Sequence, residues 1–301
     1  MDVPHVSVLL EPIVDFLRNA TRLIDGTLGA GGHTYALLQA GVGHVLGLDL
    51  DTQAIQIAQH HLHLFSGRVT IQHGSYVDMK QHAAALGWDQ VDGILLDLGV
   101  SSMQLDTPER GFAFMKPGPL DMRFDQNAMQ ASAADIVNTW TEDELTDIFF
   151  RYGEERFSRQ IARAIIRNRP FETTTQLATL IEKSVPRHKK GNHPATRVFQ
   201  ALRIAVNNEL AHIERTLPDA IDLLRPGGRL AVISFHSLED RIVKHIFKAA
   251  STEVVSPPGM MLQEKRATIK LLTRKPIVAD EQEIHLNPRS RSAKLRIVEK
   301  L

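Results

Sequence analysis

A glycine-rich turn near the amino terminus is the first feature of the sequence that suggests chemistry. Residues 25–33 read Asp-Gly-Thr-Leu-Gly-Ala-Gly-Gly-His and follow a short apolar run at 22–25. Glycines at such a turn let the backbone approach a ligand closely and direct the amides of the next helix toward it. Asp49 ends a second apolar run, and an acid in that position accepts hydrogen bonds from ribose hydroxyls. These residues predict a site for a cofactor that contains adenosine.

Dinucleotides and S-adenosylmethionine both fit a glycine-rich turn followed by an acid. The dinucleotide fingerprint G-x-G-x-x-G is incomplete, because Thr34 stands where the third glycine belongs. The sequence therefore disfavours an NAD oxidoreductase without excluding one. Asp97 ends another apolar run and would lie at the same edge of the sheet as Asp49. Tyr76, which follows the third expected strand, either stacks on an adenine or packs in the core.

Short apolar runs that alternate with helical stretches predict the elements that position these residues. The pattern is typical of a doubly wound α/β sheet. After the fourth strand the next convincing one begins about 130 residues later, whereas a βαβ step takes roughly 30. The intervening stretch reads as helix. We therefore expect a discontinuous α/β domain over 1–107 and 195–301, with a helical domain inserted at 108–194. Strands are expected at 22–25, 44–49, 69–72, 93–97, 229–235, 269–273 and 294–298.

Composition excludes several other classes of protein. Hydrophobic residues make up 43% and charged residues 23% of the 301-residue chain, which is ordinary for a globular protein. No apolar run approaches the roughly 20 residues of a membrane span, and we expect a cytoplasmic protein. The absence of cysteine excludes disulfides, thiolate zinc sites and cysteine nucleophiles. No histidine and acid spacing predicts a metal site.

The charge is segregated along a chain whose net charge is zero. Residues 151–203 carry 12 basic and 4 acidic residues, and residues 265–301 carry 10 and 4. Such segments suit a polyanionic partner, but solvated helix faces fit them equally well. The basic residues that we expect to contact RNA phosphates are Arg156, Arg159, Arg163 and Arg167 at helical spacing, together with Lys189, Lys190, Arg289 and Arg291.

Blocks spread in order over nearly the whole chain resemble the bacterial 16S ribosomal RNA (cytosine-N4) methyltransferases. The first two are the glycine-rich turn and Asp97–Asp106, which reads Asp-Leu-Gly-Val-Ser-Ser-Met-Gln-Leu-Asp. The others are Glu109–Met115, Gly118–Arg123, Tyr152–Phe157, His193–Arg197, Ser234–Lys244 and Asn287–Ser292. This resemblance implies a class I methyltransferase sheet of Rossmann-like form with a helical insertion that recognises RNA.

The resemblance also implies which residues hold S-adenosylmethionine. They are Gly31, Gly32, His33, Asp49, Tyr76, Asp97 and Gln104. The reaction it implies is methyl transfer to the N4 amine of a cytidine in the decoding region of 16S ribosomal RNA, within the small ribosomal subunit. An RNA-binding ribosome assembly factor without catalysis is the alternative, and an intact cofactor site argues against it.

The group that accepts a hydrogen bond from the cytosine amine is not settled by the sequence. Asp97 and His236 are the two candidates, since Asp97 ends one expected strand and His236 comes just after another. Ser237 is expected to be a helix N-cap, with Asp240 completing a box-like pair. Phe112 and Phe114 either stack on the target base or anchor their loop.

Overall fold

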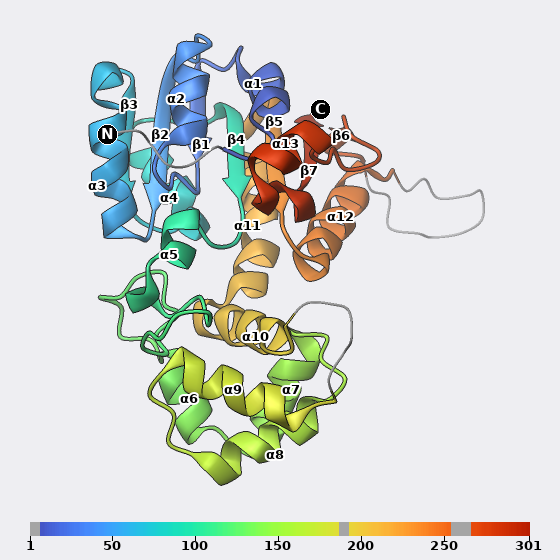
Figure 1. Cartoon of the computed structure of the whole chain (residues 1–301). Coiled ribbons are helices and arrows are strands. Elements are labelled where there is room, and N and C mark those ends of the chain that lie inside the picture. Colours follow the sequence, from blue (N-terminus) through green and yellow to red (C-terminus); the bar gives the residue numbers. More distant parts are fainter. Residues whose placement is uncertain (1–6, 187–192, 254–265) are drawn as a thin grey trace, which may run out of the picture. The chain divides into compact units, whose positions relative to one another are not determined.

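The computed structural model describes residues 7–186, 193–253 and 266–301, which belong to two compact units (Figure 1). Unit 1 comprises Met1–Gly99 and Leu210–Leu301, and unit 2 comprises Val100–Glu209. Unit 2 begins earlier and ends later than the insertion expected at 108–194. The physical reason is packing, because Val100 and Val198 belong to the hydrophobic core of unit 2.

Unit 1 contains one seven-stranded sheet with the strand order β3-β2-β1-β4-β5-β7-β6. β1 to β5 are parallel, and β7 is antiparallel to both β5 and β6. The expected α/β sheet is thereby confirmed. The strands are β1 (Arg22–Asp25), β2 (His44–Asp49), β3 (Val69–His73), β4 (Val91–Asp97), β5 (Leu224–Ser234), β6 (Ile269–Leu271) and β7 (Lys294–Lys300).

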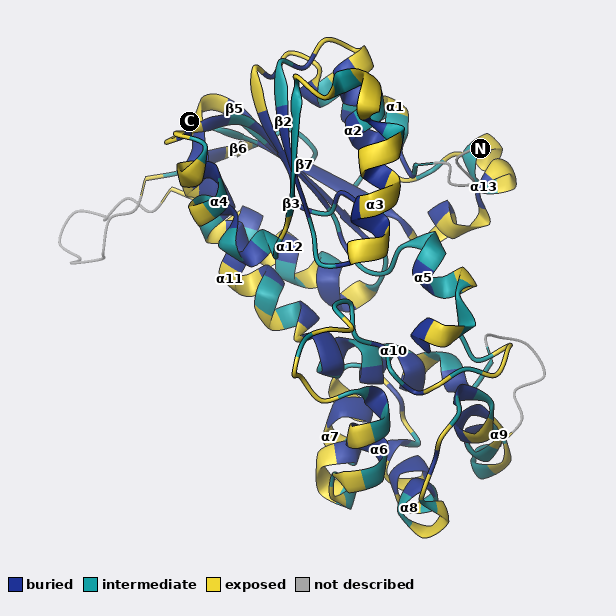
Figure 2. Ribbon diagram, turned by 90° about the vertical axis from the view of Figure 1, so that its left-hand side faces the viewer, coloured by how far each residue is buried: buried dark blue, intermediate teal, exposed yellow. Residues whose placement is uncertain are grey.

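Helices cover both faces of this sheet (Figure 1). Alternate residues of a strand point to opposite sides, and in this sheet the apolar side chains on both sides pack under helices. Ile94 of β4 belongs to the cluster under α4, α11 and α12, whereas its neighbour Leu95 belongs to the cluster under α1, α2 and α3. In Figure 2 most residues of β1, β2 and β4 have the colour of buried residues, whereas the edge strand β3 is mainly intermediate. The helices are α1 (Leu10–Leu17), α2 (Gly32–Gln39), α3 (Thr52–His61), α4 (Met79–Ala85), α11 (Glu209–Leu223), α12 (Ser237–Ser251) and α13 (Glu281–Leu286), with 3-10 turns η1 (His63–Phe65), η2 (Tyr76–Asp78) and η4 (Pro288–Ser292).

Unit 2 is helical throughout its regular structure. Its core is formed by aliphatic and aromatic side chains such as Phe149 and Ile161, both almost fully buried. The helix that starts after Thr141 has a capping box, in which Thr141 and Glu144 exchange side-chain-to-backbone hydrogen bonds. The elements are α5 (Ser102–Asp106), η3 (Pro108–Arg110), α6 (Ala133–Thr139), α7 (Glu142–Arg151), α8 (Ser158–Asn168), α9 (Thr174–Ser184) and α10 (Ala195–Asn207). Within the described ranges, no helix of either unit has the length and hydrophobicity needed to cross a membrane.

Candidate functional site

Asp25, the last residue of β1, holds the glycine-rich turn in shape. Its side chain accepts hydrogen bonds from the Thr27 amide at 3.2 Å and from the Thr34 hydroxyl at 2.7 Å. Burial raises the pKa of this carboxyl, although both hydrogen bonds act in the opposite direction. Thr34, which replaces the third glycine of a dinucleotide fingerprint, thus has a structural role. Between these partners Gly29 and Gly31 adopt φ values of 53° and 81°, a region that favours glycine.

Asp49, at the end of β2, joins the turn to the next helix. One carboxylate oxygen accepts from the Gly29 amide at 2.7 Å, and the other accepts from the Asp51 amide at 2.8 Å. Burial raises the pKa of Asp49 to about 6 against the effect of these two hydrogen bonds. A carboxylate offers about four lone-pair positions, so two remain for ligand hydroxyls. Asp49 is therefore placed to accept from a pair of neighbouring hydroxyl groups.

Asp97, at the end of β4, has one carboxylate oxygen that is out of reach of solvent and makes no hydrogen bond to any described residue. Its other oxygen lies 3.8 Å from Nδ1 of His33. The His33 Nε2 atom faces the carbonyl oxygen of Val8 at 2.9 Å and must donate there, because a carbonyl only accepts. Burial raises the pKa of Asp97 to about 6, with His33 lowering it and the charges of Asp25 and Glu239 raising it further.

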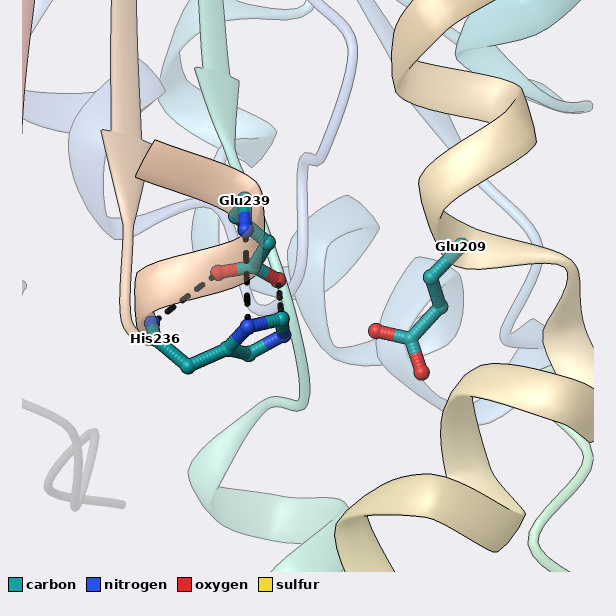
Figure 3. Close-up of side chains that lie close together, drawn as sticks. All are labelled: Glu209, His236 and Glu239. Carbon is teal, nitrogen blue, oxygen red and sulfur yellow. Dashed lines mark hydrogen bonds and ion pairs between the residues drawn. The ribbon is translucent and has the colours of Figure 1, made fainter. Parts of the chain in front are cut away.

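His236 and Glu239 form a pair at the start of α12, beside the end of β5 (Figure 3). Glu239 is completely buried, and its Oε2 accepts from the amides of Phe235 and His236 at 2.8 and 3.3 Å. The imidazole Nε2 lies 3.1 Å from Glu239 Oε1, and Nδ1 accepts from the Glu239 amide at 3.5 Å. Both ring nitrogens of His236 are therefore directed at Glu239. The expected N-cap at Ser237 is wrong by one residue, because the imidazole caps the helix instead.

The remaining cofactor candidates fall in both units. Gly31 and Gly32 begin α2 in unit 1, where a Cβ on Gly32 would lie only 2.2 Å from the Ser7 hydroxyl oxygen. Tyr76 is half-buried in η2, against the cluster under α4, α11 and α12. Gln104 is buried in α5 of unit 2, where it forms a capping box with Ser101.

Of the arginines expected to contact RNA, Arg159, Arg163 and Arg167 lie on the exposed side of α8 and Arg156 lies just before this helix. Arg159 and Arg163 have acidic partners on α7. Arg163 donates to Glu142 at 2.8 Å, and Arg159 lies 3.9 Å from Asp143. The Arg156 guanidinium lies over the Phe157 ring at 4.7 Å, and Arg167 is exposed. The other expected contacts divide between Arg289 and Arg291, which are exposed on η4, and Lys189 and Lys190, which lie outside the described residues.

The two phenylalanines with open roles anchor their loop. Phe112 is 7% exposed and stacks on Phe124 with ring centroids 5.8 Å apart. Phe114 packs on His193 and Phe199 at 4.8 and 4.9 Å. Packing inside unit 2 therefore accounts for both rings.

Sequence reasoning missed two acids of the site. Asp25 was included in the turn without a role, although it lies one strand from Asp49 and Asp97 at the same sheet edge. The sequence feature that could have indicated this role is Thr34, whose hydroxyl stands where a dinucleotide fingerprint has a glycine and can donate to a nearby acid. Glu239 was missed because histidine is not among the usual N-cap residues, which shifted the expected capping box by one position.

The strand order with an antiparallel β7, the glycine-rich turn after β1, and acids at the ends of β1, β2 and β4 define a class I methyltransferase domain. The family model described as the MraW methylase family matches residues 2–301. The chain belongs to this family.

Curated relatives match along the whole chain. The protein named Ribosomal RNA small subunit methyltransferase H from Citrifermentans bemidjiense is 49% identical to this chain. The alignment covers 100% of this chain and 99% of the relative. The one from Thermomicrobium roseum is 46% identical, with coverages of 100% and 95%. Among solved structures, an rRNA methylase from Streptococcus thermophilus has a TM-score of 0.44 at 10% identity, with coverages of 97% and 93%.

Proposed function

We propose that this protein transfers a methyl group from S-adenosylmethionine to the N4 amine of a cytidine in the decoding region of 16S ribosomal RNA. The observation that carries the proposal is the set of acids at the ends of β1, β2 and β4, beside a glycine-rich turn, in a chain of the MraW methylase family. Curated relatives named for ribosomal RNA of the small subunit support the choice of substrate. A substrate within the small ribosomal subunit places the reaction in the cytoplasm.

The residues of unit 1 fit the methyl donor. The two unused acceptor positions of Asp49 suit the ribose hydroxyls, and the ring of Tyr76 suits the adenine. Gly31, Gly32 and His33 form the start of α2, whose amides point out of the helix end. When bound, S-adenosylmethionine supplies an electrophilic methyl group on a sulfonium. We assign Gln104 to the same cofactor from the family resemblance.

Asp97 is the better of the two candidates for the acceptor of the cytosine amine. Its side chain is 22% exposed, and Oδ1 has no hydrogen-bond partner among the described residues, so the carboxylate has acceptor positions left for an amine hydrogen. In His236, Nδ1 accepts from the Glu239 amide, so Nε2 of the neutral ring carries the proton and cannot accept from an amine, although Nε2 lies 3.1 Å from Glu239 Oε1 without a hydrogen bond to it. In the reaction the amine nitrogen bonds to the methyl carbon, the sulfur–carbon bond breaks, and one amine proton leaves. By accepting from that N–H, Asp97 would localise the nitrogen lone pair and stabilise the developing positive charge.

Cofactor affinity is expected to depend on pH through Asp49 and Asp97. Their ionised forms accept hydrogen bonds, so affinity is complete above a pKa of about 6 and falls as the pH drops through it. Each carboxylate that must ionise lowers affinity about tenfold per pH unit below its pKa. Isothermal titration at pH 8 to 5 measures this, and Asp97→Asn should show a smaller dependence than the wild type. A dissociation constant that stays the same from pH 8 to 5 would contradict the assignment.

RNA recognition by unit 2 is the second part of the proposal, and the arginines of α8 support it. Arg159 and Arg163 would have to exchange Asp143 and Glu142 for phosphates, which is feasible because exposed ion pairs contribute only about 0–1 kcal/mol. The double variant R159Q/R163Q should reduce the salt slope of RNA binding by up to about 1.4, since each single-strand phosphate contact contributes about 0.7. Lys183→Gln on α9 serves as a single-charge control. An unchanged slope would assign the stripe to a solvated helix face.

Nucleoside analysis tests the reaction type. The protein is incubated with methyl-labelled S-adenosylmethionine and either free 16S RNA or small subunits that lack the modification. The RNA is then digested and its methylated nucleosides are separated by chromatography and mass spectrometry. N4-methylcytidine from either substrate supports the proposal. Cofactor and RNA binding without any methylated nucleoside would favour an assembly factor.

A further inference from the structure

The charged side chains that α12 exposes to solvent are all basic. The exposed charged or titratable side chains on this helix are Arg241, Lys244, His245 and Lys248. Their spacing places them on one side of the helix, opposite Val243 and Phe247, which pack in the core of unit 1. The helix therefore presents the positive charges of Arg241, Lys244 and Lys248 to solvent in one row, with His245 beside them.

Acids on the same helix do not neutralise this row. Glu239 is fully buried at the first turn, and Asp240 is engaged by Arg296 at 2.7 Å and by Lys294 at 3.4 Å. Within the described part of the chain, no carboxylate forms an ion pair with Lys244 or Lys248. The α8 stripe differs in this respect, because two of its arginines have acidic partners on α7. Phosphates binding to α12 would thus displace no carboxylate from these two lysines.

The basic row leads away from the edge of the sheet that carries the candidate site. Glu239 in the first turn of α12 is close enough to Asp97 for its charge to raise the pKa of that acid. At the same edge, Lys294 at the start of β7 pairs with Ser234 at the end of β5. The exposed Arg291 lies in η4, immediately before β7. Arg241 to Lys248 cover about 10 Å of helix, which is long enough for contacts with neighbouring phosphates of one strand.

We infer that the exposed face of α12, with Arg291 of η4, binds the phosphate backbone of the RNA next to the methylated nucleotide. This inference rests on the proposed function, since it takes ribosomal RNA as the polyanion. It places part of the RNA contact on the methyltransferase unit itself, in addition to the helical unit 2. Lysine ammonium groups contact phosphates without reading the bases, so the surface contributes affinity and orientation rather than sequence preference.

The double variant K244Q/K248Q tests the surface directly. We expect it to weaken binding of a single-stranded decoding-region RNA about 10- to 30-fold at 0.1 M salt and to reduce the salt slope by about 1.4. The affinity for S-adenosylmethionine should stay at the wild-type value, because neither lysine belongs to the cofactor site. The matched control R18Q/R22Q removes two charges from the opposite side of unit 1, since Arg22 begins β1, which runs parallel toward the candidate site. The control should leave both RNA affinity and slope unchanged.

The outcomes separate this inference from the proposed function. A wild-type protein that methylates cytidine, together with a K244Q/K248Q slope equal to that of the wild type, would overturn the surface and leave the function intact. Equal losses of RNA affinity in K244Q/K248Q and R18Q/R22Q would also overturn the proposed α12 surface, because they would reflect the net charge of the protein alone. A wild-type protein that binds the RNA but transfers no methyl group would instead count against the proposed function.

Discussion

Asp97→Asn is expected to lower the single-turnover rate of methyl transfer by about 100-fold or more at saturating S-adenosylmethionine. Asparagine keeps the size of the side chain and one acceptor oxygen but removes the negative charge that would face the amine as it becomes positive. Losing one such preorganised electrostatic partner typically costs 10²- to 10³-fold in rate. Rapid-quench measurement with labelled cofactor and small ribosomal subunits determines the rate without interference from product release.

The structure provides a control for this prediction. His236→Asn should retain more than a fifth of the wild-type rate, because the imidazole is directed at Glu239 and asparagine is a good N-cap. Asp97→Asn should also unfold at a temperature a few degrees higher than the wild type. A carboxyl whose pKa is raised by folding destabilises the folded state once it ionises, here by up to about 3 kcal/mol near neutral pH. A large loss in His236→Asn with a near-normal rate in Asp97→Asn would reverse the two assignments.

Asp49→Asn is expected to weaken binding of S-adenosylmethionine by at least about 100-fold. The carboxylate accepts from two backbone amides through different oxygens, at 2.7 and 2.8 Å. An asparagine would place an NH2 group against one of these N–H donors, which opens the glycine-rich turn. It would also remove the charge-assisted hydrogen bonds to the ribose, which are worth about 1.5–3 kcal/mol each. Titration calorimetry measures the dissociation constant.

Asp51→Asn is the matched control two residues away. Asp51 caps α3 by accepting from the Gln53 amide at 3.0 Å, and asparagine caps a helix about equally well. We expect its affinity for S-adenosylmethionine to lie within about threefold of the wild type. Similar losses in both variants would show that negative charge near the turn matters, and not the contacts of Asp49.

The cofactor half of the site was accessible from the sequence because its signals are local. Asp49 and Asp97 each end an apolar run, and parallel strands bring their carboxyl ends to one edge. The glycine-rich turn was recognisable in the same way, and in the structure Gly29 and Gly31 adopt positive φ values. Once the strands were expected to be parallel, no further information was needed to place these acids at the same edge of the sheet.

Features that depend on contacts between distant segments were not accessible. The pairing of Arg163 with Glu142 joins residues of two helices, and a charge count along the chain does not show it. The basic face of α12 was hidden in the sequence, because Glu239 and Asp240 stand directly before it and offset its charge until the fold buries one acid and pairs the other. The limits of unit 2 likewise depend on which side chains join its core.

Three neighbouring strands end in acids at one edge of the sheet, and this arrangement raises the free energy of ionising them. The folded protein holds Asp25, Asp49 and Asp97 at raised pKa values, so each resists ionisation before the ligand binds. Hydroxyl and amine donors on the ligand and substrate would relieve this cost, since they favour the ionised form. The same three carboxyls therefore lower the stability of the free protein and would take part in ligand binding and catalysis.

The most direct test of the account locates the transferred methyl group. Small subunits lacking the modification are incubated with labelled S-adenosylmethionine and either the wild type or Asp97→Asn, and the RNA is cut with nucleases for mass spectrometry of the fragments. The account predicts one N4-methylcytidine, in the decoding region, with the wild type and almost none with the variant in the same time. A methyl group on another atom or outside that region, or equal transfer by both proteins, would contradict it.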